Sequence, residues 1–267
     1  MVSPSLTRYT SQGVTLLGDT NRPGGVTFAF TERTGGVSTG PYASLNLGGR
    51  CGDDPVAVAR NRELALAALG ADGIARNLVE PRQVHGDEVV VVRSARGAEL
   101  ARARERAQAG ADAVVCTAPG VPVLLCFADC VPVVLAAPGA FAVVHSGWRG
   151  TLARISAKAL GVLCDEAGCA PADVFAYVGP HIAGEDYEVS EELLATFTSE
   201  FGRIVHVAAT TSNLDLSAAI ACALGQAGLP AQNLVDTCES TATNLGRFYS
   251  YRAEGGICGR HAAIAYL

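Results

Sequence analysis

Several features that mark particular protein classes are scarce or absent in this chain. No apolar run reaches the roughly 18 residues that a membrane-spanning helix needs, and the opening residues lack the apolar core of a secretory signal peptide. The nine cysteines are an odd number and never form a Cys-x-x-Cys pair, which argues against a disulfide framework and against a zinc finger. We therefore expect a protein of the reducing cytoplasm.

Charge is also modest, at 20 basic and 26 acidic residues and a net charge of −6. This balance argues against a nucleic-acid groove or a basic membrane-binding face, and favours a small-molecule partner. Apolar residues, by contrast, make up 49% of the 267 positions, which is enough for a large core. No repeat, low-complexity tract or linker divides the chain, so we expect one mixed α/β domain over residues 1–267, of undetermined oligomeric state.

Reactive residues concentrate in one stretch, residues 121–150, VPVLLCFADCVPVVLAAPGAFAVVHSGWRG. Its two apolar, β-branched-rich runs are typical of buried strands, and Asp129, Cys130 and His145 lie at their ends. A cysteine here can be a metal thiolate or a nucleophile, and a histidine can be a ligand or a base. Either residue taken alone is more often structural, so the stretch leaves these alternatives open.

Two neighbours favour a functional role for this stretch. Asp129 interrupts an apolar run, where a carboxylate needs a partner. Arg149, in the sequence GWRG, lies just before a helix-like segment at 151–168. A helix start presents backbone N–H groups to an anion, so Arg149 is a candidate for anion binding.

The pattern of apolar and turn-forming residues predicts the other elements. Strands are expected at 26–30, 89–92, 111–117, 174–178, 203–207 and 233–238, and as two strand-like runs within 246–267. Helices are expected from the Asp54-Pro55 pair to Gly70, over 97–110, after Ser190, and from about Asp215 to 229.

Polar residues on the loops add binding candidates. A long Gly-rich loop, TERTGGVSTGPYASLNLGG, carries Arg33, Ser44 and Asn46; long loops often line sites, although its composition fits a solvated loop equally well. His85 lies in the turn Gln-Val-His-Gly directly before the strand at 89–92, where its side chain could project into a pocket or serve a structural role.

Several of these motifs together resemble the laccase-domain family, also described as multicopper polyphenol oxidase-like, purine nucleoside phosphorylase and peptidoglycan editing factor. The motifs are QVHG (83–86), ADCVP (128–132), HSGWRG (145–150), VGPHI (178–182) with YEV (187–189), FYSYR (248–252), and TERTGGVSTGPYASLNLG near the start. They cover nearly the whole chain in the family's order. The chain departs from the usual pattern at Ser146, His181 and Cys258, where Ala, Cys and Thr are more common.

The resemblance implies a zinc ion bound by His85, Cys130 and His145, a site that would also accept copper. Three nitrogen and sulfur ligands with an open fourth position are typical of catalytic zinc. The implied fold is a single-domain layered sandwich of mixed β-sheets flanked by helices, related to cysteine-hydrolase-like toxins. The implied activity is phosphorolysis of purine nucleosides such as adenosine, inosine and methylthioadenosine, with adenosine deamination as a second reaction.

These reactions suggest roles for other residues. Asp129 is a candidate for moving protons in deamination, beside the catalytic Cys130. Phosphorolysis needs a cation that holds phosphate against the sugar, and Arg149 is the first candidate. Substrate contacts are expected from five further side chains: Arg33, Ser44, Asn46, Gln83 and Arg252.

Three other functions draw on the same residues. A true multicopper oxidase holds several copper ions through many histidines, and five histidines with one methionine are too few. An amidase with Cys130 as nucleophile and His145 as base would suit the peptidoglycan-editing name. The third function is that of a binding protein without catalysis. It would not explain why an Asp-Cys pair occurs together with GWRG.

Overall fold

The structure, a computed structural model, describes residues 3–207 and 212–267. The strands are β1 (Thr7–Ser11), β2 (Val14–Gly18), β3 (Thr27–Thr31), β4 (Val89–Val92), β5 (Ala113–Cys116), β6 (Val123–Phe127), β7 (Val131–Ala137), β8 (Ala140–Ser146), β9 (Phe175–Val178), β10 (Leu234–Asp236) and β11 (His261–Tyr266). The α-helices are α1 (Pro55–Ala68), α2 (Gly97–Ala109), α3 (Trp148–Leu152), α4 (Ile155–Ala167), α5 (Glu191–Phe201) and α6 (Leu216–Gln226). None of these helices is long and apolar enough to cross a membrane.

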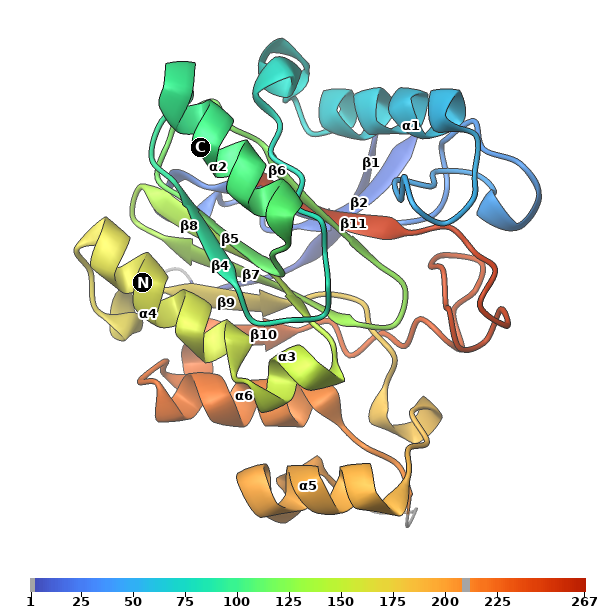
Figure 1. Ribbon diagram of the computed structural model, residues 1–267, viewed down its shortest axis with the longest axis vertical. Helices are drawn as coiled ribbons and strands as arrows, with labels where there is room; N and C mark the ends of the chain where they lie inside the picture. The colour runs from blue at the N-terminus through green and yellow to red at the C-terminus, as the bar shows by residue number, and fades with distance from the viewer. Residues whose placement is uncertain (1–2, 208–211) are drawn as a thin grey trace.

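The strands form two sheets that pack face to face. The five-stranded sheet is antiparallel, in the order β1-β2-β3-β11-β6. The six-stranded sheet is mixed, in the order β10-β9-β7-β8-β5-β4, with parallel pairs only at its two edges. Helices cover the outer faces, with α1 over the first sheet and α4 and α6 over the second (Figure 1). This layered sandwich confirms the expected fold class.

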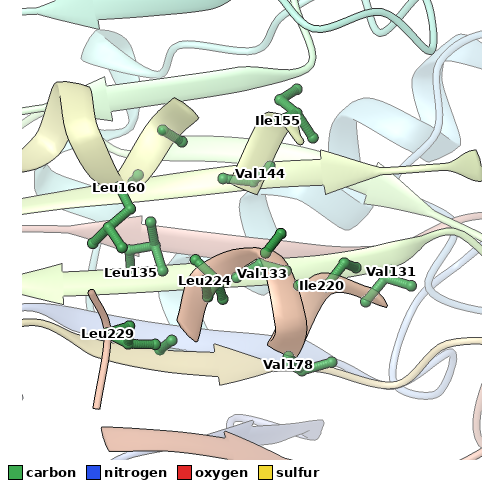
Figure 2. Close-up of a cluster of buried hydrophobic side chains, with 14 of the residues drawn as sticks. Val131, Val133, Leu135, Val144, Ile155, Leu160, Val178, Ile220, Leu224 and Leu229 are labelled. Atoms are coloured by element: carbon green, nitrogen blue, oxygen red, sulfur yellow. The ribbon is translucent and has the colours of Figure 1, made fainter. Parts of the chain in front are cut away.

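Successive side chains of a strand point to opposite faces of its sheet, and this explains how the sheets pack against each other and against the helices. In β6, Leu124 packs in the cluster beneath α1, whereas its neighbour Leu125 points between the sheets. In β7, Val133 and Leu135 meet α4 and α6 on the outer face of the mixed sheet (Figure 2), and Val134 faces the other sheet. Because both faces of β7 are covered, an unbroken apolar run is what the strand requires.

Most expected elements are present, and their boundaries follow local chemistry. Asp54, Ser190 and Asp215 cap α1, α5 and α6 by accepting hydrogen bonds from backbone N–H groups. The central stretch, however, contains three strands, β6, β7 and β8, where two apolar runs were expected. A turn at residues 128–130 separates β6 from β7 and carries the chain from one sheet to the other.

The structure differs from three other predictions, in one case only in where the helix starts and breaks. The helix expected over 151–168 begins earlier, as α3, and is broken at Arg154, whose φ of 57° is left-handed. The strand expected at 203–207 is a 3₁₀ turn, Gly202–Val205, in which Val205 is buried and Ile204 is 57% exposed. Of the two runs expected within 246–267, only β11 forms; Phe248 and Tyr249 are buried in succession, without the alternation of a strand.

Candidate metal centre

The pairing of β7 with β8 brings Cys130 and His145 together. In this antiparallel pair, Pro132 lies opposite His145 and Val131 lies opposite Ser146. Cys130, immediately before β7, therefore lies beside Gly147, immediately after β8. Two apolar strands that pair for burial thus place a thiol and an imidazole at one end of the sheet.

His85 reaches the same point from the loop before β4, and Asp112 holds it there. The Asp112 carboxylate accepts hydrogen bonds from the backbone N–H groups of Val84 (3.1 Å), His85 (3.0 Å) and Gly86 (2.8 Å). His85 itself has a φ of 59°, a left-handed conformation that costs energy in a residue other than glycine. The three hydrogen bonds compensate for that cost.

Asp112 also orients His145. Its Oδ1 atom lies 2.8 Å from His145 Nδ1, and the carboxylate is fully buried. Burial alone would raise the pKa of Asp112, but hydrogen bonds from His145 and from the backbone outweigh it and keep that pKa below its usual value. Since Nδ1 of His145 faces a carboxylate, Nε2 is the nitrogen left for a metal, an arrangement common among zinc ligands.

The ligand atoms of His85, Cys130 and His145 all lie within 4.8 Å of one another. In the described part of the chain, no other group of three His, Cys, Asp or Glu residues could hold a metal. A Cβ on Gly147 would come within 3.1 Å of Cys130 Sγ and 3.2 Å of His85 Cδ2, so the group packs tightly against Gly147, and a larger residue there would push its ligand atoms by a few tenths of an ångström. One thiolate and two imidazoles suit zinc, and they would also accept copper. His181 lies outside this group, with Nδ1 2.8 Å from Gly179 O.

Cys130 and His145 shift one another's ionisation. Burial raises the pKa of the Cys130 thiol, but the charge of His145 and hydrogen bonds from His145 and His85 outweigh burial and lower it to about 6. Burial likewise disfavours the charged form of His145, yet Cys130 and Asp112 raise the pKa of His145 to about 9. In the absence of metal the pair is therefore a thiolate and an imidazolium, and the thiolate is the form that binds metal.

The three ligand residues line a cavity of about 690 Å³. Of the other expected site residues, Asp129, Gln83 and Arg252 line it too. The Gln83 side chain bonds to the backbone N and O of Cys126, at 2.8 and 2.7 Å. The Arg252 guanidinium lies 5.2 Å from the centre of the Tyr187 ring.

Asp129 occupies a constrained position on the cavity wall. Its φ is 86°, and it is 9% exposed. One carboxylate oxygen accepts the hydroxyl of Thr241 and the other accepts the backbone N–H of Arg252, each at 2.7 Å. Asp129 was expected to need a partner because it interrupts an apolar run. Its partners are two hydrogen-bond donors from the C-terminal segment.

Three residues of the Gly-rich loop lie outside the cavity lining and support the loop. Arg33 donates to the carbonyls of Ala43 and Leu245 and forms an ion pair of 3.1 Å with Glu254. The Ser44 hydroxyl lies 3.2 Å from Gly36 N, and Asn46 is fully buried. These side chains bond to the protein's own polar groups and support the loop, and their contact with substrate stays a prediction.

Arg149 is also outside the cavity lining. It lies on α3, is exposed, and stacks its guanidinium 4.3 Å from the centre of the Trp148 ring. The helix expected to start at residue 151 starts at Trp148, so Arg149 lies inside a five-residue helix and not before one. Its role in anion binding stays a prediction. Trp148, its neighbour, lines the cavity instead.

Sequence reasoning missed Asp112 and two cavity arginines, Arg50 and Arg260. Asp112 had a signal, because it is a carboxylate at the entry of an apolar strand, as Asp129 is. No sequence signal marks Arg50 and Arg260 as cavity residues, because their position on the cavity wall depends on the path of distant loops.

Known proteins resemble this chain over most of its length. A family model described as multi-copper polyphenol oxidoreductase laccase matches residues 27–267. The chain belongs to this family. Proteins named purine nucleoside phosphorylase, from Deinococcus radiodurans and Streptomyces coelicolor, are each 38% identical to it; the alignments cover 91% and 94% of this chain and 89% and 100% of theirs.

Two further similarities extend the comparison. A protein named adenosine deaminase RL5, from an unidentified prokaryote, is 32% identical over 87% of this chain and 90% of its own. The crystal structure of YlmD from Geobacillus stearothermophilus has a TM-score of 0.85 and 27% identity, over 98% of this chain and 99% of that one. The relatives' names point to an enzyme that acts on a small molecule.

Proposed function

We propose that this protein is a zinc-dependent purine nucleoside phosphorylase that also deaminates adenosine, acting in the cytoplasm. The observation that carries the proposal is the His85, Cys130 and His145 group, which opens on a cavity large enough for a nucleoside-sized ligand. The relatives named purine nucleoside phosphorylase and adenosine deaminase support the choice of substrate.

The chain's own residues would hold and orient the reactants. Nε2 of His145, a ring nitrogen of His85 and Sγ of Cys130 would bind zinc, which supplies Lewis acidity to a group beside it. Asp112 fixes the tautomer and orientation of His145. Arg252 and Tyr187 would contact substrate on the same wall as Asp129. Asp129 accepts one hydrogen bond on each oxygen, from Thr241 and from the Arg252 amide, and has lone pairs left with which it would take part in proton transfer.

A second candidate function is favoured by one observation. Cys130, His145 and Asp112 are arranged as a nucleophile, a base and an orienting carboxylate, and the pKa of Cys130 is lowered to about 6. A metal-free protein with this triad would be a cysteine amidase, as the peptidoglycan-editing name suggests. The two functions differ in whether Cys130 is bound to metal during turnover.

The deciding experiment combines metal analysis with turnover. Metal content would be measured on the purified protein, and release of free base from adenosine and inosine would be followed with and without phosphate. Cys130→Ala is the test variant. Cys222→Ala, at a half-buried thiol on α6 outside the cavity lining, is the matched control.

The zinc phosphorylase predicts about one zinc ion per chain and phosphate-dependent release of base. Both should be lost in Cys130→Ala and kept in Cys222→Ala. The proposal would be contradicted if the protein carries no zinc after expression in zinc-supplemented medium and leaves both nucleosides intact. Cleavage of muropeptide amides under those conditions would establish the amidase instead.

A further inference from the structure

Arg260 lies on the cavity wall without an acidic partner among the described residues. Its Nη1 atom donates to the carbonyl oxygens of Cys258 and Gly259, each at 2.8 Å. Its Nε and Nη2 atoms make no hydrogen bond to any residue that the structure describes. A cavity-lining guanidinium group with the N–H groups of two nitrogen atoms unpaired is suited to a planar, two-pronged contact with an anion.

The surrounding loop fixes the position of Arg260. Asn46 Oδ1 accepts the Arg260 backbone N–H at 2.8 Å, and the Leu47 N–H donates to Arg260 O at 2.9 Å. Gly48 leaves room for the side chain, because a Cβ there would lie 2.6 Å from Arg260 Cγ. Asn46 is therefore a positioning residue for Arg260, which accounts for its complete burial.

Arg50 supplies a second cation from the same loop. It lines the cavity, and its Nη2 atom donates to Gln108 Oε1 at 3.2 Å, with no ion pair in the described ranges. The acid on this part of the wall, Glu80, is already paired with Arg62. The charge of Arg50 also acts on Glu80, so Arg50 and Arg62 share one carboxylate, and Arg260 has no acidic partner among the described residues.

This basic wall continues into the metal centre through Cys126. Gln83, two residues before His85, is bonded to the Cys126 backbone, and Cys126 Sγ lies 3.5 Å from Leu47 O. Cys126 precedes Cys130 by four residues, which span at most about 14 Å of extended chain. Because the arginines and the metal ligands line the same cavity, a ligand that fills it can contact both.

We propose that Arg260 and Arg50 form a subsite for a phosphate group. The proposal rests on the phosphorylase function, in which inorganic phosphate is the second substrate. A phosphate oxygen forms a bond to C1′ of the ribose as the bond from C1′ to the purine nitrogen breaks. The electron pair of that bond stays on the purine, which takes up a proton, and ribose 1-phosphate is the other product. The 5′-phosphate of a nucleotide has the same chemistry and is tested as a separate source.

Binding of inorganic phosphate and of adenosine 5′-monophosphate would be measured by calorimetry on metal-loaded protein, without turnover. The test variants are Arg260→Gln, Arg260→Lys and Arg50→Gln. Arg102→Gln is the control, because Arg102 is exposed on α2 and outside the cavity lining. Cys130→Ala reports binding that depends on the metal alone. The phosphate KM and the nucleoside KM would be measured in parallel.

We expect Arg260→Gln to weaken phosphate binding about tenfold to hundredfold, and Arg50→Gln to weaken it less. Arg260→Lys should fall between, because it keeps the charge and loses the fork, while Arg102→Gln should bind as the wild type does. The phosphate KM should rise with little change in the nucleoside KM. Wild-type affinity in Arg260→Gln would overturn the proposal, as would phosphate binding that disappears only in Cys130→Ala.

The remaining outcomes separate this proposal from the proposed function. Arg260-dependent phosphate binding by a protein that turns over no nucleoside would support the subsite and contradict the phosphorylase. Arg260-dependent binding of the nucleotide, without binding of free phosphate, would support the subsite and assign it to the 5′-phosphate.

Discussion

Asp112 Oδ1 accepts a hydrogen bond from His145 Nδ1 at 2.8 Å, between two buried side chains. The same carboxylate accepts the backbone N–H of His85. One side chain therefore sets the direction of one expected ligand and the backbone position of another. Such partners commonly change metal affinity as strongly as a weak ligand does, because they hold the ligand atoms in place before the metal arrives.

We expect Asp112→Asn to lower zinc affinity about tenfold to hundredfold. The amide keeps one acceptor oxygen, but its NH₂ group would face backbone N–H donors or His145, so one part of the arrangement must be lost. Competition with a chromogenic chelator measures the affinity. Asp72→Asn, at an exposed carboxylate, is the control. Equal zinc affinity in the two variants would show that Asp112 does not position the ligands.

Gly147→Ala should disrupt the metal centre while leaving the fold intact. The added Cβ would press against Cys130 Sγ at 3.1 Å and His85 Cδ2 at 3.2 Å, whereas the Gly147 φ of −78° suits alanine. We expect loss of bound zinc, with an unchanged circular dichroism spectrum. Gly161→Ala in α4, where a Cβ meets nothing within 4 Å, should keep the metal and gain up to about 1 kcal/mol of stability. Full zinc content in Gly147→Ala would contradict the ligand set.

Cys130 should react with iodoacetamide near neutral pH in metal-free protein. Its pKa is lowered to about 6, so its alkylation rate should rise through that pH and level off. Burial instead raises the pKa of Cys116 and that of Cys126 to about 12, which makes them slow internal controls in the same peptide digest. Added zinc should protect Cys130. Rapid alkylation of zinc-loaded protein, with activity lost in step, would favour the amidase.

How much of this molecule follows from the sequence depends on the range of the interactions. Helix caps such as Asp54 and Ser190 act within three residues, and the structure confirms them. Apolar runs predict β7 and β8 because each strand is buried on both faces. The convergence of His85 with Cys130 was not derivable from spacing, because it depends on which strands pair, and it was expected only from the family resemblance.

The site residues that the sequence did not place correctly relative to the cavity share one physical cause. Polar residues on a long loop can contact a ligand or satisfy the loop's own backbone, and composition does not distinguish the two. Arg33 and Asn46 form hydrogen bonds with backbone groups of the protein itself. Asp112 stands at the entry of an apolar strand, which marks it as a carboxylate in need of partners, but those partners come from another strand and another loop, and the sequence does not identify them. Long-range pairing decides which polar residues face the cavity.

His261 should make the protein sensitive to acid. It is fully buried against Phe127 and Phe248, and neither ring nitrogen has a hydrogen-bond partner among the described residues. Burial lowers its pKa from 6.5 to about 3. Below pH 6.5 the unfolded chain therefore binds a proton at His261, whereas the folded chain binds it only below about pH 3. The titration of His261 leaves the free energy of unfolding unchanged above pH 6.5. Below pH 6.5 it lowers that free energy by about 1.4 kcal/mol for each pH unit, down to about pH 3.

His261→Phe removes this titration and fills the same space. We expect the variant to gain about 1–3 kcal/mol at pH 7, because an unpartnered polar group is replaced by an apolar one. Its advantage over the wild type should then grow by about 3 kcal/mol between pH 7 and pH 4.5. Urea unfolding of both proteins in chelator measures the difference, and effects of pH on other groups cancel in the comparison. An advantage that stays constant with pH would mean that His261 is protonated in the folded protein, and so has a partner that offsets its burial.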